Sequence, residues 1–367
     1  MAYLDYAANT PVDGRVLIKF LEESERYIAN PNSNHTLGKE AKKKIDECSK
    51  YIASFFNADP ENVIYTSGAS EANNLVVKGI AGMHESGKII ISAVEHSSIV
   101  APVNFLADKG YEVAIIPLKE NGQVDLEVLE NEMTDDTILV SVCYVDSELG
   151  TIQPIRKIAN IVSNYPNCKF HTDATQAIGK TAVDFECVDF VTFAPHKFYG
   201  LPGMGILLNL TNTKIVPLIH GGKSTTPYRS GTPTTADIEC AALALDLAIN
   251  RFEDRLERST KVSDYLKEGL KKLHIELNNP INSIPNTVNF SVPNAQDLYK
   301  YLDKHEIYVS TKAACALDDV PSKSVLAITG DKEKALNSIR VSISHLTNYS
   351  DVDEFLEALA EWLKNNK

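Results

Sequence analysis

Short apolar segments alternate with helical patterns through the first two thirds of the chain. Runs rich in β-branched residues and bounded by turn residues predict strands at residues 63–66, 88–92, 112–116, 137–144, 169–172, 189–194 and 205–208. The intervening patterns predict helices at residues 37–55, 71–81, 98–109 and 154–163. Continuous apolar strands that alternate with helices are typical of a mostly parallel sheet covered on both faces. The pattern therefore predicts an α/β fold with a seven-stranded sheet.

The last third of the chain follows a different pattern. A long helical pattern runs from about residue 235 towards residue 273, and because it exceeds the usual length we expect it to bridge two domains. Beyond it, a mixture typical of a small α+β domain predicts strands at 287–292, 307–310 and 338–342 and helices at 295–305 and 350–364. For 367 residues, we expect a large domain at 15–252 and a small domain formed by 1–14 and 253–367.

Composition and charge exclude several classes of protein. Hydrophobic residues make up 44% and charged residues 23%, as in ordinary globular proteins, and the net charge of −13 disfavours nucleic-acid binding as the main task. No apolar run is long enough to predict a membrane span, and the first residues do not resemble a secretory signal. The cysteines form no C-x-x-C pair, so we expect reduced thiols in a cytoplasmic protein: Cys48, Cys143, Cys168, Cys187, Cys240 and Cys315.

Three motifs carry candidate chemistry, and each also has an ordinary structural reading. Residues 66–71 pass from a strand to a helix start, where Gly68 and free N–H groups suit a phosphate, although the same residues suit a simple N-cap. Asp173 follows a buried strand, where a carboxylate either pairs with a cationic ring nitrogen or caps a helix. Lys197 follows another strand, either as a desolvated amine for Schiff-base chemistry or as a surface lysine.

The combination of these motifs is more specific than any one of them. Pyridoxal phosphate requires an anchored phosphate, an acid at its ring nitrogen and a lysine for its aldehyde. The order and spacing of the motifs resemble class V aminotransferases of fold type I, and most closely the NifS/IscS-type cysteine desulfurases. The resemblance extends over nearly the whole chain, at residues 3–11, 30–35, 66–71, 95–96, 148–150, 173–176, 196–197, 229–232, 310–315 and 339–342.

The resemblance implies a role for each matching residue around the cofactor ring. Lys197 would bind the cofactor aldehyde and later move the proton of the substrate Cα. Asp173 would hold the ring nitrogen protonated, and His96 would stack on the ring and act as an acid or base. Gln176 would bond the phenolic oxygen, and Ser147 would lie beside the cofactor. His96 also suits a helix-capping or core histidine.

The phosphate and the substrate carboxylate have their own implied partners. Ala69, Ser70 and His196 would hold the phosphate, helped by Thr232 of the partner subunit, so a homodimer is expected. Arg340 would clamp the substrate carboxylate, a task that suits its planar guanidinium, with Asn34 as a further substrate contact. Ordinary readings remain, a surface ion pair for Arg340 and a turn residue for Thr232.

Cys315 decides the reaction that the resemblance implies. In this family the cysteine at this position attacks the sulfur of the substrate, which releases L-alanine from L-cysteine and leaves a persulfide. An acceptor protein would collect that sulfur for iron–sulfur clusters, thio-cofactors or tRNA thiolation. The nucleophile must be a thiolate, and Lys312 is a candidate cation to lower its pKa. A purely structural Cys315 is the alternative.

The departures from the family pattern concentrate near the predicted pocket. Ser147 stands where the second Asn of V-N-N-E-I-G is common, Ala194 where a serine is usual, Tyr6 where an asparagine is usual, and Lys312 where a glycine is usual. A cysteine desulfurase with no metal site is the leading prediction. One alternative is a related class V enzyme in which Cys315 is not catalytic, either an aminotransferase or a lyase of selenocysteine or another amino acid. The other alternative is a non-enzymatic partner in sulfur trafficking.

Overall fold

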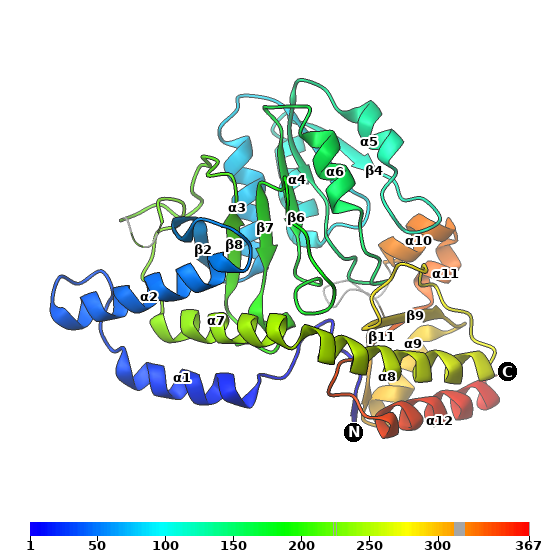
Figure 1. Cartoon of the computed structure of the whole chain (residues 1–367). Helices are drawn as coiled ribbons and strands as arrows, with labels where there is room; N and C mark the ends of the chain where they lie inside the picture. Colours follow the sequence, from blue (N-terminus) through cyan, green and yellow to red (C-terminus); the bar gives the residue numbers. More distant parts are fainter. Residues whose placement is uncertain (223, 225, 312–319, 367) are drawn as a thin grey trace.

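The computed structural model describes residues 1–222, 224, 226–311 and 320–366 (Figure 1). Within these residues a seven-stranded sheet has the order β2-β8-β7-β6-β5-β3-β4. Its strands are β2 (Val63–Thr66), β3 (Lys88–Ser92), β4 (Glu112–Ile116), β5 (Thr137–Ser141), β6 (Lys169–Asp173), β7 (Phe190–Phe193) and β8 (Gly205–Asn209). Neighbouring strands are parallel except β8, which is antiparallel to β2 and to β7. The predicted mostly parallel α/β sheet is confirmed.

Alternate side chains of the buried strands point to two separate hydrophobic clusters, one on each face of the sheet. In β3, Ile89 and Ile91 join one cluster and Ile90 joins the other. The first face is covered by α3 (Ala69–Ala81) and α4 (Ser97–Ala107). The opposite face is covered by α2 (Thr36–Ser54), α6 (Ile155–Val162) and α7 (Thr235–Asn250), with α5 (Leu126–Glu132) at its margin. Burial on both faces explains why these strands are continuously apolar.

A third hydrophobic cluster forms a smaller unit beside one end of the sheet (Figure 1). Here β9 (Thr287–Ser291) pairs antiparallel with β11 (Ser338–Ser342), and β1 (Ala2–Tyr3) pairs parallel with β10 (Ile307–Tyr308). The helices of this unit are α8 (Phe252–Lys272), α9 (Ala295–Lys304) and α12 (Tyr349–Asn365), and α10 (Lys323–Thr329) and α11 (Lys332–Leu336) lie nearby. Ala2 and Leu4 join this cluster, whereas Val16 joins the cluster of the large sheet. The exact domain boundaries stay a prediction.

The predicted single long helix from residue 235 to 273 is wrong. It is divided into α7 and α8 at Arg251, whose φ of −114° and ψ of 18° leave the helical region. Helix α7 buries its side chains in the large cluster, and α8 buries Val262, Leu266 and Leu270 in the small one. The break lets each helix align with its own core.

Two elements near the N-terminus were not predicted from the pattern. Helix α1 (Gly14–Arg26) packs on α7, and its cap Asp13 accepts a hydrogen bond from the Arg15 N–H. Strand β1 has only two residues, too few for a periodic signal. It forms by pairing with β10, and because β10 lies far away along the chain no local pattern predicts this pair. No helix in the described part of the chain is both long and apolar enough to span a membrane.

Candidate active site

The carboxyl ends of five strands meet along one edge of the sheet, because β2, β3, β5, β6 and β7 all run in the same direction. Ligands of open α/β sheets bind at such an edge. A cavity of about 330 Å³ lies there. It is lined by nine of the residues predicted from the sequence, Ala69, Ser70, His96, Ser147, Asp173, Gln176, His196, Lys197 and Arg340.

One end of the cavity is formed by the start of α3. The first N–H groups of a helix have no partner within it, and the helix dipole makes this end attractive to an anion. Gly68, Ala69 and Ser70 line the cavity here, and a Cβ added at Gly68 would meet no atom within 4 Å. Behind it the backbone is close-packed, since a Cβ at Gly205 would lie 2.3 Å from the Gly68 carbonyl carbon. The helix start therefore offers an open, rigid anion site.

Asp173 ends strand β6 at the floor of the cavity. Its Oδ2 accepts a hydrogen bond from Asn73 Nδ2 at 2.8 Å, and its Oδ1 accepts one from the Thr175 N–H at 2.9 Å. The same Asn73 amide donates to Ser98 Oγ at 2.9 Å. These contacts hold the carboxylate at the cavity wall. The capping alternative does not describe it, because no helix follows Asp173 directly.

His96 both caps a helix and lines the cavity. Its Nδ1 accepts the Ser98 N–H at 3.2 Å at the start of α4, and Ser98 Oγ lies 2.8 Å from the same atom. Because Nδ1 acts as the acceptor, the ring carries its proton on Nε2. Burial lowers the pKa of His96; the Asp173 carboxylate opposes this effect, and the charges of Lys197 and Lys323 add to it. A neutral imidazole at neutral pH follows.

Lys197 ends a short 3₁₀ turn, Pro195–Lys197, directly after β7. Its Nζ donates to the Ala7 carbonyl at 2.9 Å and to the Ala8 carbonyl at 2.5 Å. The N-terminal segment thus lines the cavity at Ala7 and Ala8 and contacts the amine. Lys197 is therefore a cavity residue rather than a surface lysine.

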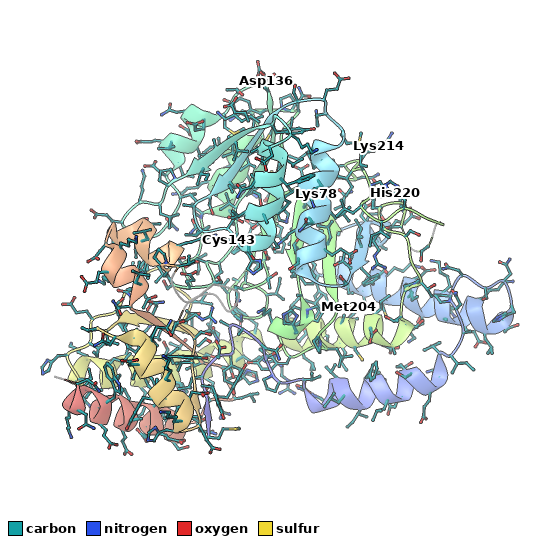
Figure 2. All side chains as sticks on the ribbon, turned by 180° about the vertical axis from the view of Figure 1, so that it is seen from behind. Lys78, Asp136, Cys143, Met204, Lys214 and His220 are labelled. Carbon is teal, nitrogen blue, oxygen red and sulfur yellow. The ribbon has the colours of Figure 1, made fainter. Side chains whose placement is uncertain are left out.

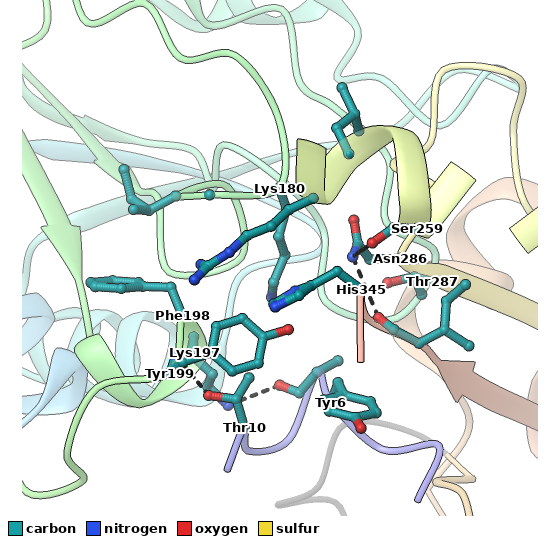
Figure 3. A pocket seen from close by; sticks show the side chains of 16 residues that line it. Tyr6, Thr10, Lys180, Lys197, Phe198, Tyr199, Ser259, Asn286, Thr287 and His345 are labelled. Carbon is teal, nitrogen blue, oxygen red and sulfur yellow. Dashed lines mark hydrogen bonds between the residues drawn. The ribbon is translucent and has the colours of Figure 1, made fainter. Parts of the chain in front are cut away.

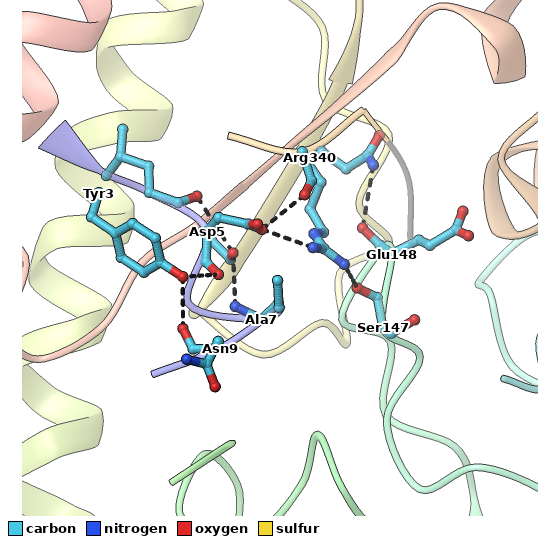
Figure 4. A network of polar contacts seen from close by, with 12 residues as sticks. Tyr3, Asp5, Ala7, Asn9, Ser147, Glu148 and Arg340 are labelled. Carbon is cyan, nitrogen blue, oxygen red and sulfur yellow. Dashed lines mark hydrogen bonds and ion pairs between the residues drawn. The ribbon is translucent and has the colours of Figure 1, made fainter. Parts of the chain in front are cut away.

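Arg340 is fully buried in β11, with 2% of its surface exposed. Its Nη2 pairs with Asp5 Oδ1 at 2.9 Å, and its Nη1 donates to the Ser147 carbonyl oxygen at 3.0 Å (Figure 4). Its Nε has no hydrogen-bond partner among the residues that the structure describes. The surface ion pair considered above is wrong. The ion pair is internal, and it fixes the guanidinium at the cavity wall with donor capacity left.

The polar atoms of the cavity fit pyridoxal phosphate. His196 Nδ1 and Thr175 Oγ1 line the wall and are buried, yet neither has a partner within the described ranges. Burial, together with Lys197 and Lys180, lowers the pKa of His196 to about 4, so its ring is neutral and has one N–H to donate. Unpaired buried polar atoms are costly, and a phosphate-bearing ring would satisfy them. The acid Asp173, the amine Lys197 and the helix start supply the remaining contacts.

Several predicted residues lie elsewhere. Asn34, between α1 and α2, and Thr232, before α7, are exposed and do not line the cavity. Tyr6 lines a second, smaller cavity beside Lys197. Cys315 and Lys312 lie outside the described residues, so the sulfur-transfer prediction for Cys315 rests on the sequence. No cluster of three or more metal-binding side chains occurs in the part of the chain that is described.

Sequence reasoning missed four polar residues of the site: Asn73, Glu95, Cys143 and Thr175. Glu95 precedes His96 in the motif at residues 95–96, and its buried carboxyl accepts the Cys143 N–H at 2.7 Å. Cys143 follows β5 and lines the cavity; Figure 2 shows it from behind, where the sheet approaches the small unit. For Asn73, the sequence offered only its place one turn into a helix that starts at the phosphate site.

Comparisons with known proteins agree with this geometry. The sequence model of the family "Aminotransferase class-V" matches residues 2–355. The cysteine desulfurase IscS of Dictyoglomus turgidum is 37% identical, over 97% of this chain and 93% of that protein. A solved NifS-like protein superposes with a TM-score of 0.93 at 32% identity, covering 99% of this chain and 100% of that one. A structure of SspA in complex with cysteine superposes with a TM-score of 0.84 at 29% identity, covering 95% and 100% of the two chains.

The family match and the alignments extend over nearly the whole chain, and this length decides the family assignment. The residues that line the cavity come from five strand ends and from both units of the fold. The chain therefore belongs to the class V aminotransferase family, and within it to the cysteine desulfurases of the IscS and NifS type.

Proposed function

We propose that this protein converts L-cysteine to L-alanine with pyridoxal phosphate as cofactor and passes the sulfur to Cys315. The observation that carries the proposal is the convergence of Lys197, Asp173, Arg340 and the start of α3 on one cavity. Bound pyridoxal phosphate supplies an aldehyde for the substrate amine and a ring that withdraws electrons from its Cα.

The chain's own residues have distinct tasks in this reaction. The N–H groups at the start of α3, with Ser70 and His196, hold the phosphate, and Asp173 holds a proton at the ring nitrogen. Lys197 Nζ moves the Cα proton. Arg340 binds the substrate carboxylate, and its bond to Asp5 keeps the guanidinium in place.

The sulfur transfer balances as a thiol displacement. The thiol of Cys315 and the thiol of the substrate yield a Cys315 persulfide and L-alanine. One S–S bond forms and the substrate Cβ–S bond breaks, and the carbon gains a proton with the electron pair of the broken bond. The Cys315 thiolate is the nucleophile. An acceptor protein in the cytoplasm then takes the outer sulfur for iron–sulfur clusters or thiolation.

The active protein is proposed to be a homodimer. Three large apolar side chains of α1 face solvent, Leu17 at 46%, Ile18 at 60% and Leu21 at 67% exposure. A monomer seldom exposes such a group on one helix. Thr232 and Asn34 do not line the cavity of their own subunit, and we propose that they contribute to the cavity of the partner.

The test compares the wild type with Cys315→Ala, and Cys187→Ala is the matched control because Cys187 is an exposed cysteine outside the site. Each protein is incubated with L-cysteine and dithiothreitol, and alanine and sulfide are quantified. We expect equimolar products from the wild type and the control and neither product from Cys315→Ala.

Other outcomes contradict the proposal in distinct ways. Full activity of Cys315→Ala would indicate a related lyase or aminotransferase in which this cysteine is incidental. A yellow protein that makes neither product would exclude cysteine as the substrate. A protein that takes up no pyridoxal phosphate would favour a non-enzymatic partner in sulfur trafficking.

A further inference from the structure

Lys180 is a polar residue next to the site for which the reaction proposed above has no use. It ends the turn that follows β6, in which Gly179 has a φ of +73°. A Cβ at Gly179 would lie 3.0 Å from the Ala248 Cβ of α7, so glycine allows both the turn and the close packing. The turn brings the Lys180 side chain back to Gln176, and its Nζ donates to Gln176 Oε1 at 2.6 Å.

The other end of the Gln176 amide is also held. Gln176 Nε2 donates to the Ala7 carbonyl oxygen at 2.9 Å. The same carbonyl accepts a hydrogen bond from Lys197 Nζ, also at 2.9 Å. Lys180, Gln176, Ala7 and Lys197 thus form one continuous chain of hydrogen bonds along the cavity wall.

This chain determines which way the amide of Gln176 faces. A glutamine amide has an acceptor oxygen and a donor nitrogen that are almost the same size, so its orientation depends on its partners. Lys180 presents N–H donors, which requires Oε1 on its side, and the Ala7 carbonyl accepts only, which requires Nε2 on its side. Nε2 carries two protons and Ala7 uses one. The second N–H remains for a group in the cavity, which Gln176 lines.

We propose that Lys180 is a positioning residue that orients Gln176, so that an amide N–H rather than the amide oxygen meets the phenolic oxygen of pyridoxal phosphate. This inference rests on the proposed function. A phenolate oxygen is an acceptor, so a reversed amide would place two acceptors against each other. Lys180 itself is not among the residues that line the 330 Å³ cavity.

The surroundings of Lys180 suit such a role. Lys180 and Lys197 both line a second cavity of about 20 Å³, together with Tyr199 and His345 (Figure 3). That volume admits about one water molecule. Burial, together with the positive charges of Lys197 and Arg340, lowers the pKa of Lys180 to about 7. An ammonium can only donate to Oε1 and a neutral amine can still do so, while the Ala7 carbonyl requires Nε2 on its side at either charge, so the orientation of Gln176 holds on either side of neutral pH.

The experiment measures the dissociation constant of pyridoxal phosphate by absorbance titration of the full-length apoprotein. Lys180→Met removes the donor at nearly constant volume, Lys180→Arg keeps a donor, and Gln176→Ala removes the amide. We expect Lys180→Met to weaken binding about tenfold, the equivalent of one hydrogen bond. We expect Lys180→Arg to restore binding to within about threefold of the wild type, since it keeps a charged donor.

Two comparisons separate positioning from a general structural effect. In the Gln176→Ala background, Lys180→Met is expected to cause no further loss, because there is no amide left to orient. With 3-deoxypyridoxal 5′-phosphate, which lacks the phenolic oxygen, the wild type and Lys180→Met are expected to bind equally. The same loss in both backgrounds, or with both ligands, would overturn the inference.

Three other results of this experiment can be distinguished. Wild-type affinity in Lys180→Met would overturn the role of Lys180 while leaving the proposed function intact. A wild type that does not bind pyridoxal phosphate would overturn both. If Lys180→Met lowers the melting temperature of the apoprotein, the Lys180→Arg variant and the deoxy ligand decide the question, since a folding defect weakens both ligands alike.

Discussion

The buried carboxyl group of Glu95 is expected to make the free energy of unfolding depend on pH. Its side chain is buried next to the cavity, where Oε1 accepts hydrogen bonds from Ser92 Oγ and the Cys143 N–H. Oε2 has no partner among the residues described. Burial, with a smaller contribution from the nearby charge of Asp173, raises the pKa of Glu95 from 4.5 to about 8 against the opposing effect of the hydrogen bonds from Ser92 and Cys143. Glu95 is therefore a neutral carboxylic acid at pH 7.

The sign of the effect follows from the protons bound in each state. Between pH 4.5 and about 8 the folded protein keeps a proton on Glu95 that the unfolded chain has released. The free energy of unfolding therefore falls as the pH rises through this window. The linkage relation gives a loss of about 2.5 kcal/mol between pH 5 and pH 7 from this group, and about 5 kcal/mol in all above pH 8.

Glu95→Gln tests this reasoning, because glutamine has the shape of the protonated acid and cannot titrate. Urea unfolding of both proteins, each saturated with pyridoxal phosphate, is measured from pH 5 to pH 8. We expect the stability of the variant relative to the wild type to rise by about 2.5 kcal/mol between pH 5 and pH 7. Exposed Glu120→Gln is the control and is expected to show no such trend. Parallel pH curves for Glu95→Gln and wild type would refute the reasoning.

Three further predictions follow from the packing of the site and of α1. Gly205→Ala places a Cβ against the Gly68 backbone. We therefore expect pyridoxal phosphate to bind at least about tenfold more weakly and the free energy of unfolding to fall by about 1–3 kcal/mol. Unchanged cofactor and urea titrations would contradict this expectation. Arg340→Lys removes the planar guanidinium that can bond Asp5 and the substrate carboxylate at the same time. We expect KM for cysteine to rise about 10–100-fold with cofactor affinity unchanged. An unaltered KM would show that Arg340 does not bind the carboxylate. Leu21→Glu is expected to yield a folded monomer in light scattering, whereas a dimer would place the interface elsewhere.

Much of the fold could be read from the order of apolar residues. Strands β2, β3 and β4 have the bounds that the pattern predicts. Strands β2 and β3 are buried throughout, and such a strand is a short apolar run between turn residues. The places of Asp173 and Lys197 in the candidate site could also be predicted from the sequence. Asp173 ends β6 and Lys197 ends the short turn after β7, and the carboxyl ends of parallel strands gather at one edge. Local sequence therefore sufficed wherever one strand end supplies one functional side chain.

The contacts that hold those side chains were decided only by the tertiary structure. Arg340 meets Asp5 across 335 residues of chain, and Asn73 meets Asp173 across 100. The order of strands in the sheet creates such pairs, and hydrophobic periodicity carries no information about that order. The break at Arg251 has the same origin, since α7 and α8 pack on separate cores. Sequence pattern specifies which face of an element is buried, whereas the packing of distant elements specifies which polar groups meet.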